Sequence, residues 1–228
     1  MKVTAIVPSA GLGERLNKKI AKPLVLLNRK PIVIHTLENL SKSKLINEII
    51  LVVSRNYIDA FRKNIKHFGL KKVKNIILGG VTRSQSVANG LKAISEDTDF
   101  VLIHDAVRPF ISQKSISEVV KSAKKFGAAI LAVPAKATIK KVDLNKSEVV
   151  ETLNRDVLCE VMTPQVFRKD LILSGYNRLR KFSFTDDAVL LERLGYRVKV
   201  VMGSYTNIKI TTPEDLIVAE GIVKNFKT

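Results

Sequence analysis

The chain has 228 residues, of which 46% are hydrophobic and 26% charged, a composition that suits one large or two small globular domains. A chain of this length can fold without a disulfide or a structural metal. Its single cysteine, Cys159, excludes an internal disulfide and a cysteine-based zinc site, and is expected to be a buried or incidental thiol in a reducing compartment. The 39 Lys and Arg against 21 Asp and Glu give a formal net charge of +18, which keeps nucleic-acid binding open as an alternative function.

The amino-terminal segment does not have the pattern of an export signal. Its apolar run, 3–7, has only five residues before Pro8, which is too short for the hydrophobic region of such a signal. No stretch approaches the ~20 apolar residues of a membrane span. We therefore expect a soluble, cytoplasmic protein that has no membrane partner.

Apolar runs rich in β-branched residues alternate with segments of helical periodicity. Near-continuous apolar runs are typical of strands buried on both faces of a largely parallel sheet, and they occur at 3–7, 48–53, 75–78, 100–104 and 128–133. Helical patterns lie between them at 31–40, 57–67, 83–95 and 113–126. This order predicts a three-layer α/β/α fold around a mostly parallel sheet.

Two helices begin with clear capping signals. Thr82 and Gln85 form a capping-box pattern. Thr212 and Pro213 place a cap and a first-turn proline before the last apolar stripe. In the helix over 113–126, Phe126 falls on the inward apolar stripe, while lysines occupy the opposite, solvated face.

Residues 136–163 differ from the rest of the chain because they are polar and alternating, around a turn signal at 143–146. We interpret this segment as a β-hairpin arm that leaves the main body. No linker rich in Pro, Gly or Ser divides the chain, so we expect one domain over 1–228, with 136–163 as an arm within it.

A glycine-rich turn follows the first strand. Gly11 and Gly13 let the backbone approach a ligand, and the N–H groups of such a turn can bind phosphate oxygens. The turn is not a Walker A loop, and Leu16 stands where a dinucleotide fingerprint needs its third glycine. Arg15 and Lys22 follow the turn, and two cations there suit a polyphosphate. A plain tight turn is the alternative.

Asp105 follows the strand that ends at His104, where ligands bind in open α/β sheets. A carboxylate in that place can hold Mg²⁺ on a nucleotide, or it can pair with Arg108 within a turn. We expect His104 to be a hydrogen-bonded core residue. The three histidines form no local pair, which argues against a zinc site.

The turn at Gly79 and Gly80 opens into the helix over 83–95. The first turn of that helix presents Arg83 and Ser86 on one face, in a suitable place to read a base edge or a ligand hydroxyl. A capped surface helix is the alternative. Near the end of the chain, Lys209 alternates with apolar neighbours and faces the same side as Asn207 and Thr211.

Taken together and in order, these segments resemble the 2-C-methyl-D-erythritol 4-phosphate cytidylyltransferase family. The matching stretches are AGLGERL, the Lys22 region, GGVTRSQSVANGL, VLIHDAVRPF, VPAKATIK, TPQVF, TDDAVLLERLG and NIKITTPEDL, which span residues 10–216. The resemblance implies a Rossmann-like nucleotidyltransferase that uses CTP, methylerythritol phosphate and Mg²⁺. It also implies a homodimer in which the arm embraces a second subunit.

The resemblance assigns a role to each matching position. Catalytic cations would be Arg15 and Lys22, with Arg155 contributed by the arm. Nucleotide binding would fall to Ala10, Gly11, Gly13, Gly80, Arg83, Ser86, Asp105 and Ala106, with Asp105 also beside the metal. Methylerythritol phosphate would contact Arg108, Thr138, Arg155, Thr163, Thr185 and Lys209.

The chain departs from the family pattern at some positions, and a sister family that shares some of the motifs offers an alternative substrate. The chain has Pro23, Ala137 and Met162 where the family commonly has glutamine, aspartate and glutamine, respectively, and the effect of these changes is not evident from the sequence. The ribitol 5-phosphate cytidylyltransferases share the glycine turn and the segment around Asp105. The residues at 155–156 and 185–188 resemble the methylerythritol enzymes more closely.

Overall fold

A computed structural model of the chain describes residues 1–11, 21–179 and 184–225. Its main element is a seven-stranded sheet with the order β11-β7-β10-β6-β1-β4-β5. The strands are β1 (Val3–Ser9), β4 (Glu48–Val53), β5 (Val73–Leu78), β6 (Phe100–Ile103), β7 (Ala128–Pro134), β10 (Cys159–Arg168) and β11 (Lys199–Met202). Only β10 runs antiparallel to its neighbours in this sheet, so the predicted mostly parallel sheet is confirmed.

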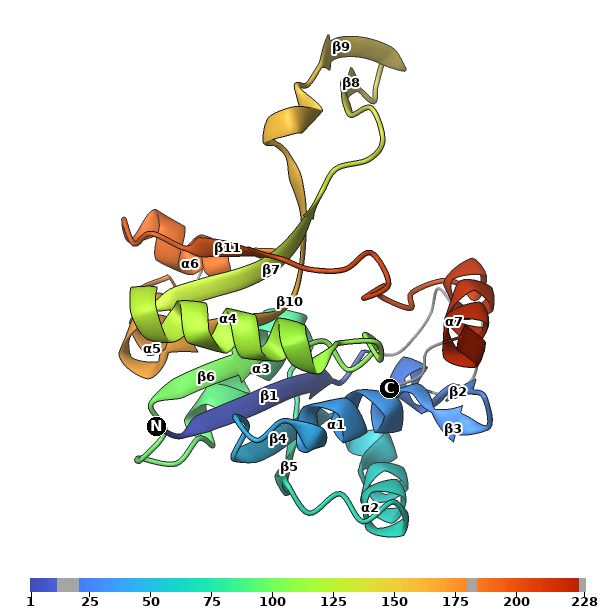
Figure 1. Ribbon diagram of the computed structural model, residues 1–228, viewed down its shortest axis with the longest axis vertical. Coiled ribbons are helices and arrows are strands. Elements are labelled where there is room, and N and C mark those ends of the chain that lie inside the picture. Colours follow the sequence, from blue (N-terminus) through green and yellow to red (C-terminus); the bar gives the residue numbers. More distant parts are fainter. Residues whose placement is uncertain (12–20, 180–183, 226–228) are drawn as a thin grey trace.

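Helices cover both faces of the sheet, as Figure 1 shows. One face packs against α1 (Ile32–Lys42), α2 (Ile58–His67) and α4 (Gln113–Phe126). The other packs against α3 (Arg83–Lys92), α5 (Lys169–Arg178) and α6 (Ala188–Arg193). In β1, Ala5 and Val7 face the first layer while Ile6 faces the second, and all three are fully buried. The three-layer prediction is therefore confirmed.

A third, smaller core lies beside the sheet. There α7 (Pro213–Asn225) packs on β2 (Leu26–Leu27), which pairs with β3 (Lys30–Pro31). Val107, Phe110 and Ile210 fill this core. It joins the loop that follows β6, which contains Val107 and Phe110, to the segment before α7, which contains Ile210. No helix in the described part of the chain is both long and apolar enough to cross a membrane.

The capping signals are confirmed. Thr82 accepts the Gln85 backbone N–H at 3.1 Å, and the Gln85 side chain in return accepts the Thr82 backbone N–H at 3.2 Å. Helix α7 begins at Pro213, and the Thr212 hydroxyl accepts the Asp215 backbone N–H at 3.3 Å.

The arm stands clear of the main body in Figure 1 as a hairpin of β8 (Lys140–Asp143) and β9 (Glu148–Thr152), followed by a 3₁₀ turn at Arg155–Val157. Strand β10 starts at Cys159 and pairs with β7 as far back as Pro134. Residues 159–163 of the predicted arm therefore lie in the central sheet.

Two side chains differ from expectation. Phe126 is 47% exposed, because it is the last residue of α4 and the chain turns at Gly127; Lys125 and Lys199 lie over its ring. The prediction of an inward Phe126 was wrong. Cys159 is exposed, so of the two expectations for it, a buried or an incidental thiol, the first was wrong.

The contact between α3 and β1 leaves no room for a side chain at Gly90. A Cβ there would lie 2.5 Å from Ile6 Cγ2, an atom of a buried, β-branched side chain. We expect Gly90→Ala to lower the free energy of unfolding by about 1 to 2 kcal/mol. The matched control is Gly221→Ala in α7, where nothing lies within 4 Å of the added Cβ. It should be neutral or stabilising by ~1 kcal/mol. Urea denaturation of both variants checks this, and equal effects would contradict the close packing.

Candidate active site

A cavity of about 480 Å³ opens at the carboxyl ends of β1 and β6. Its walls come from six short stretches that are far apart in the sequence: 8–11, 22–23, 80–83, Ser86, 105–107 and the pair Lys209 and Thr211. In open α/β sheets this edge is where ligands bind. The location predicted from the strand ends is therefore the place where the structure has a cavity.

The turn at Gly79 and Gly80 forms one wall and is closely packed. A Cβ on Gly79 would lie 2.7 Å from both Ala10 Cβ and Ser86 Oγ, so this turn requires glycine. Ser86 is 2% exposed; its hydroxyl accepts the Gly80 N–H at 3.2 Å and donates to the Thr82 carbonyl at 3.0 Å. Ser86 thus fixes the shape of the turn.

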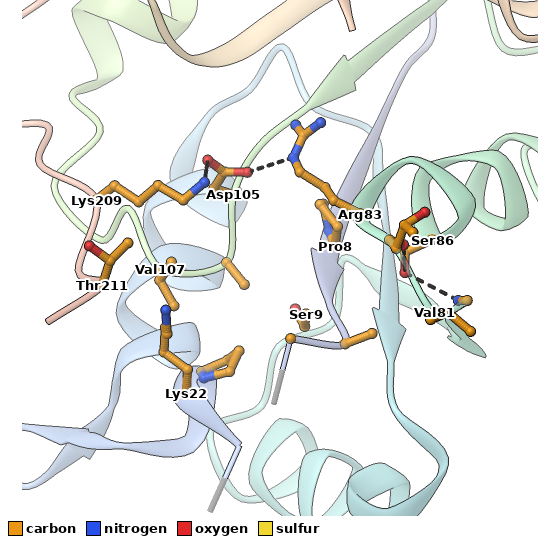
Figure 2. A pocket seen from close by; sticks show the side chains of 16 residues that line it. Pro8, Ser9, Lys22, Val81, Arg83, Ser86, Asp105, Val107, Lys209 and Thr211 are labelled. Atoms are coloured by element: carbon orange, nitrogen blue, oxygen red, sulfur yellow. Dashed lines mark hydrogen bonds and ion pairs between the residues drawn. The ribbon is translucent and has the colours of Figure 1, made fainter. Parts of the chain in front are cut away.

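Asp105 lies at the centre of a cationic cluster. Its carboxylate oxygens are 3.1 Å from Arg83 Nε, 3.0 Å from Lys209 Nζ and 3.4 Å from Arg108 Nε. Figure 2 shows Arg83 and Lys209 reaching it from opposite sides. Burial alone would raise the pKa of the Asp105 carboxyl, but the charges of Arg83, Lys209 and Arg108 outweigh burial and hold the pKa well below its usual range. Asp105 is therefore ionised.

The backbone explains how the cations reach this place. Arg83 is the first residue of α3, directly after the N-cap Thr82 and inside the capping box that Thr82 forms with Gln85. Ile210 is buried in the third core, and its N–H donates to the Val107 carbonyl at 2.9 Å. This contact places the neighbouring Lys209 at the cavity wall. Lys22 is the first residue of a 3₁₀ turn, and its side chain points into the cavity (Figure 2).

His104 supports the loop from behind. Its Nε2 lies 3.0 Å from the Arg108 carbonyl, and its Nδ1 lies 3.1 Å from the Thr163 hydroxyl. A carbonyl only accepts, so Nε2 carries the proton and Thr163 donates to Nδ1. The Thr163 oxygen also accepts the Asp105 N–H at 3.0 Å. Burial lowers the pKa of His104 to about 4, so the ring is neutral and belongs to the core, as predicted.

The described side chains around the cavity do not form a metal site of their own. Among residues 1–11, 21–179 and 184–225 there is no group of three or more His, Cys, Asp or Glu that could hold a metal ion. The Asp105 carboxylate already has three cations against it. The described side chains therefore do not fit a site built by the protein alone, and a metal-ligand role for Asp105 stays a prediction.

Comparisons with known proteins agree over nearly the whole chain. The family model for 2-C-methyl-D-erythritol 4-phosphate cytidylyltransferase (IspD) matches residues 3–225. The chain belongs to this family. The enzyme of that name from Alkaliphilus metalliredigens is 47% identical over 99% of this chain and 95% of its own, and the one from Syntrophus aciditrophicus is 45% identical over 98% and 96%. A crystal structure of 4-diphosphocytidyl-2C-methyl-D-erythritol synthase from Anaerococcus prevotii superposes with a TM-score of 0.85, at 35% identity, covering 98% of this chain and 96% of that one.

Most of the residues implied by the family resemblance come together in the structure. Those that line the cavity are Ala10, Gly11, Lys22, Gly80, Arg83, Ser86, Asp105, Ala106 and Lys209. Arg108 and Thr163 lie directly behind Asp105. Gly13 and Arg15 lie outside the described residues.

Three predicted residues do not reach this cavity within one chain. Thr138 and Arg155 are exposed on the arm, where Arg155 donates to the Lys136 carbonyl at 2.9 Å. Thr185 is exposed before α6 and is not part of the cavity lining.

Other contributors were given no role in the site by the sequence analysis. Thr211 lines the cavity as its alternation with Lys209 suggested, but the segment is not a strand, and Asn207 is buried. The Asn207 carbonyl accepts Arg108 Nη1 at 2.8 Å. Asp187 binds Arg83 Nη1 at 2.8 Å across 104 residues of sequence. No local pattern relates such distant residues.

The neutral His104 predicts acid sensitivity. Its folded pKa of about 4 lies below the ~6.5 of an exposed histidine, so the unfolded chain takes up the proton first as the pH falls. The free energy of unfolding should therefore decrease between pH 7 and pH 4.5 by about 2 kcal/mol on account of this residue. Urea denaturation at both pH values, compared with His104→Gln, measures the difference. The exposed His67, replaced by Gln, is the control. An equal pH dependence in wild type and His104→Gln would refute this assignment.

Proposed function

We propose that the protein transfers a cytidylyl group from CTP to 2-C-methyl-D-erythritol 4-phosphate, giving 4-diphosphocytidyl-2-C-methyl-D-erythritol and pyrophosphate. The reaction belongs to isoprenoid precursor biosynthesis by the non-mevalonate pathway. The observation that carries this proposal is the cavity, whose lining combines Gly11 and Gly80 with the cations Lys22, Arg83 and Lys209. Membership of the cytidylyltransferase family supports the same reaction.

The nucleotide base would lie against the Gly80 turn. The close packing of Gly79 on Ala10 and Ser86 gives this wall a fixed shape, and Val81, 98% exposed, offers an apolar surface at the cavity mouth. Fixed backbone groups can discriminate the edge of one base from another because an unpaired polar group costs binding free energy. The turn would thus select cytosine.

The phosphates would meet at the cations. The methylerythritol phosphate and the triphosphate are both anions, so their approach has to be stabilised by positive charge, and positioning is the main task of such a site. Lys22, together with Arg15 outside the described residues, would stabilise the α-phosphate as pyrophosphate leaves. The attacking phosphate is already ionised and needs no general base. His104 is not placed to act as one, because it does not line the cavity and both of its ring nitrogens are already hydrogen-bonded.

The methylerythritol phosphate would contact Lys209 and Arg108 on the same chain. Thr138 and Arg155 would reach it from the arm of a second subunit, so we propose a homodimer held by the arm. Exposed apolar side chains on the arm support a covering partner: Leu144 is 84% exposed and Val149 is 61% exposed. Thr163, which already bonds His104 and Asp105, would act by holding the Asp105 loop.

Three further proposals concern the cell compartment, the metal ion and the binding partners of the protein. We place the enzyme in the cytoplasm, without a specific nucleic-acid partner. A divalent cation, Mg²⁺ by the resemblance, would have to be held by the phosphates of CTP, since the described side chains do not offer a site of their own. Ribitol 5-phosphate is the alternative acceptor, but the curated relatives reported above carry the methylerythritol name.

Pyrophosphate release is the direct test of the reaction. With CTP and Mg²⁺, we expect release with methylerythritol phosphate and none without an acceptor. Release with ribitol 5-phosphate alone would replace the proposed acceptor, and no release with either sugar phosphate would overturn the proposed reaction.

The role of the cations is tested by substitution. We expect Lys22→Ala and Arg15→Ala each to lower kcat by two or more orders of magnitude, which corresponds to ~3 kcal/mol of transition-state stabilisation. The control is Lys124→Ala, which removes an exposed lysine of α4 and should leave kcat unchanged. Near-wild-type turnover in the first two variants would remove these residues from the mechanism.

A further inference from the structure

We propose that Asp187 and Tyr176 are positioning residues that hold the Arg83 guanidinium and, through it, the charge arrangement around Asp105. Neither residue lines the cavity. The proposal rests on the function proposed above and adds a part of the site outside the cavity.

Arg83 bridges two carboxylates with two different nitrogens. Its Nε lies 3.1 Å from Asp105 Oδ1, and its Nη1 lies 2.8 Å from Asp187 Oδ2. A guanidinium is planar and rigid, so two contacts made by separate nitrogens fix both the place and the plane of the group. A bond to Asp105 alone would leave the guanidinium free to turn about that bond.

Asp187 is itself held on both oxygens. Tyr176 Oη donates to Asp187 Oδ1 at 2.5 Å, while Oδ2 takes the bond from Arg83. The Asp187 backbone N–H donates to Gln165 Oε1 at 3.1 Å. Asp187 has no exposed surface, so these contacts replace those that water would make.

The Tyr176 hydroxyl remains the donor in its hydrogen bond to Asp187. Burial, and next the charge of Asp187, raise the pKa of its hydroxyl above the ordinary value, so the proton stays on the phenol. Its ring makes an edge-to-face contact with Phe184, at 5.6 Å between centroids. The phenol is thus fixed by α5 and by the segment that leads into α6.

The charges explain why Arg83 needs a second carboxylate. Asp105 alone would face three cations: Arg83, Arg108 and Lys209. With Asp187 bound to Arg83, the cluster keeps one net positive charge. The side chain of Lys209 is 40% exposed, against 27% for Arg83 and 11% for Arg108. Lys209 therefore presents that charge to an incoming phosphate, while Asp105 remains available to hold the Lys209 side chain in place.

A double-mutant cycle with Arg83 tests the coupling. We expect Asp187→Asn to lower kcat/KM for methylerythritol phosphate ~10-fold or more, mainly through KM, because a small displacement of a positioned group is enough for such a loss. Tyr176→Phe should have a smaller effect in the same direction. In the Arg83→Gln background, Asp187→Asn should add less than ~2-fold, since its partner is already lost.

Asp170→Asn is the matched control, because it removes an exposed carboxylate of α5 that pairs only with Arg168 among the described contacts. It should leave kcat and KM unchanged. If Asp187→Asn does not fold, the double-mutant cycle of Tyr176→Phe with Arg83→Gln tests the coupling instead. Equal losses with and without Arg83, in either cycle, would overturn the proposal, because a purely structural role gives additive effects.

A crystal structure of the variant gives a readout that does not depend on turnover. In Asp187→Asn, or in Tyr176→Phe if the former does not fold, the Arg83 guanidinium should leave its present orientation. An unchanged Arg83 would overturn the positioning role even if the enzyme is active. Loss of the proposed reaction itself is judged separately, on the wild-type rate of pyrophosphate release.

Discussion

The carboxylate of Asp105 is the interaction on which the rest of the site depends. Arg83, Arg108 and Lys209 come from three parts of the chain, and without a negative charge between them they would repel one another at these distances. The fold brings them together because β6 ends at the centre of the sheet, α3 begins beside it, and the third core fixes the segment before α7. Thr163 then holds the Asp105 backbone from behind, and His104 holds Thr163 and the Arg108 carbonyl of the same loop.

The sequence predicted those parts of the fold that depend on local pattern. Apolar runs indicated the parallel strands β1, β4, β5, β6 and β7, and side-chain caps indicated where α3 and α7 begin. The parallel strand β11 was not predicted, because most of its side chains are exposed. Strand β10 was not predicted, because Cys159–Arg168 mixes exposed polar residues with a buried half and contains a proline. Helices α5 and α6 were not predicted either, because neither begins with a side-chain cap and α6 has only six residues. The Asp187–Arg83 pair spans 104 residues, and no periodicity within one element relates its two members.

The large positive charge has two components in the structure. A few cations, among them Lys22, Arg83 and Lys209, face the cavity, where they suit a triphosphate and a sugar phosphate. Others, such as Lys124 and Lys125 on α4, lie on solvated helix faces. The charge is thus compatible with attraction of anionic substrates, and the family relationship removes the need for a nucleic-acid partner to explain it.

The most direct measurement is the rate of pyrophosphate release by Asp105→Asn, in protein shown to be folded by its unfolding transition. This change keeps the shape of the side chain and removes the charge that holds the three cations. Our account predicts a fall in kcat/KM of at least ~100-fold, because the cations would no longer be in position. A rate within about threefold of wild type would contradict the view that the Asp105 carboxylate organises the site.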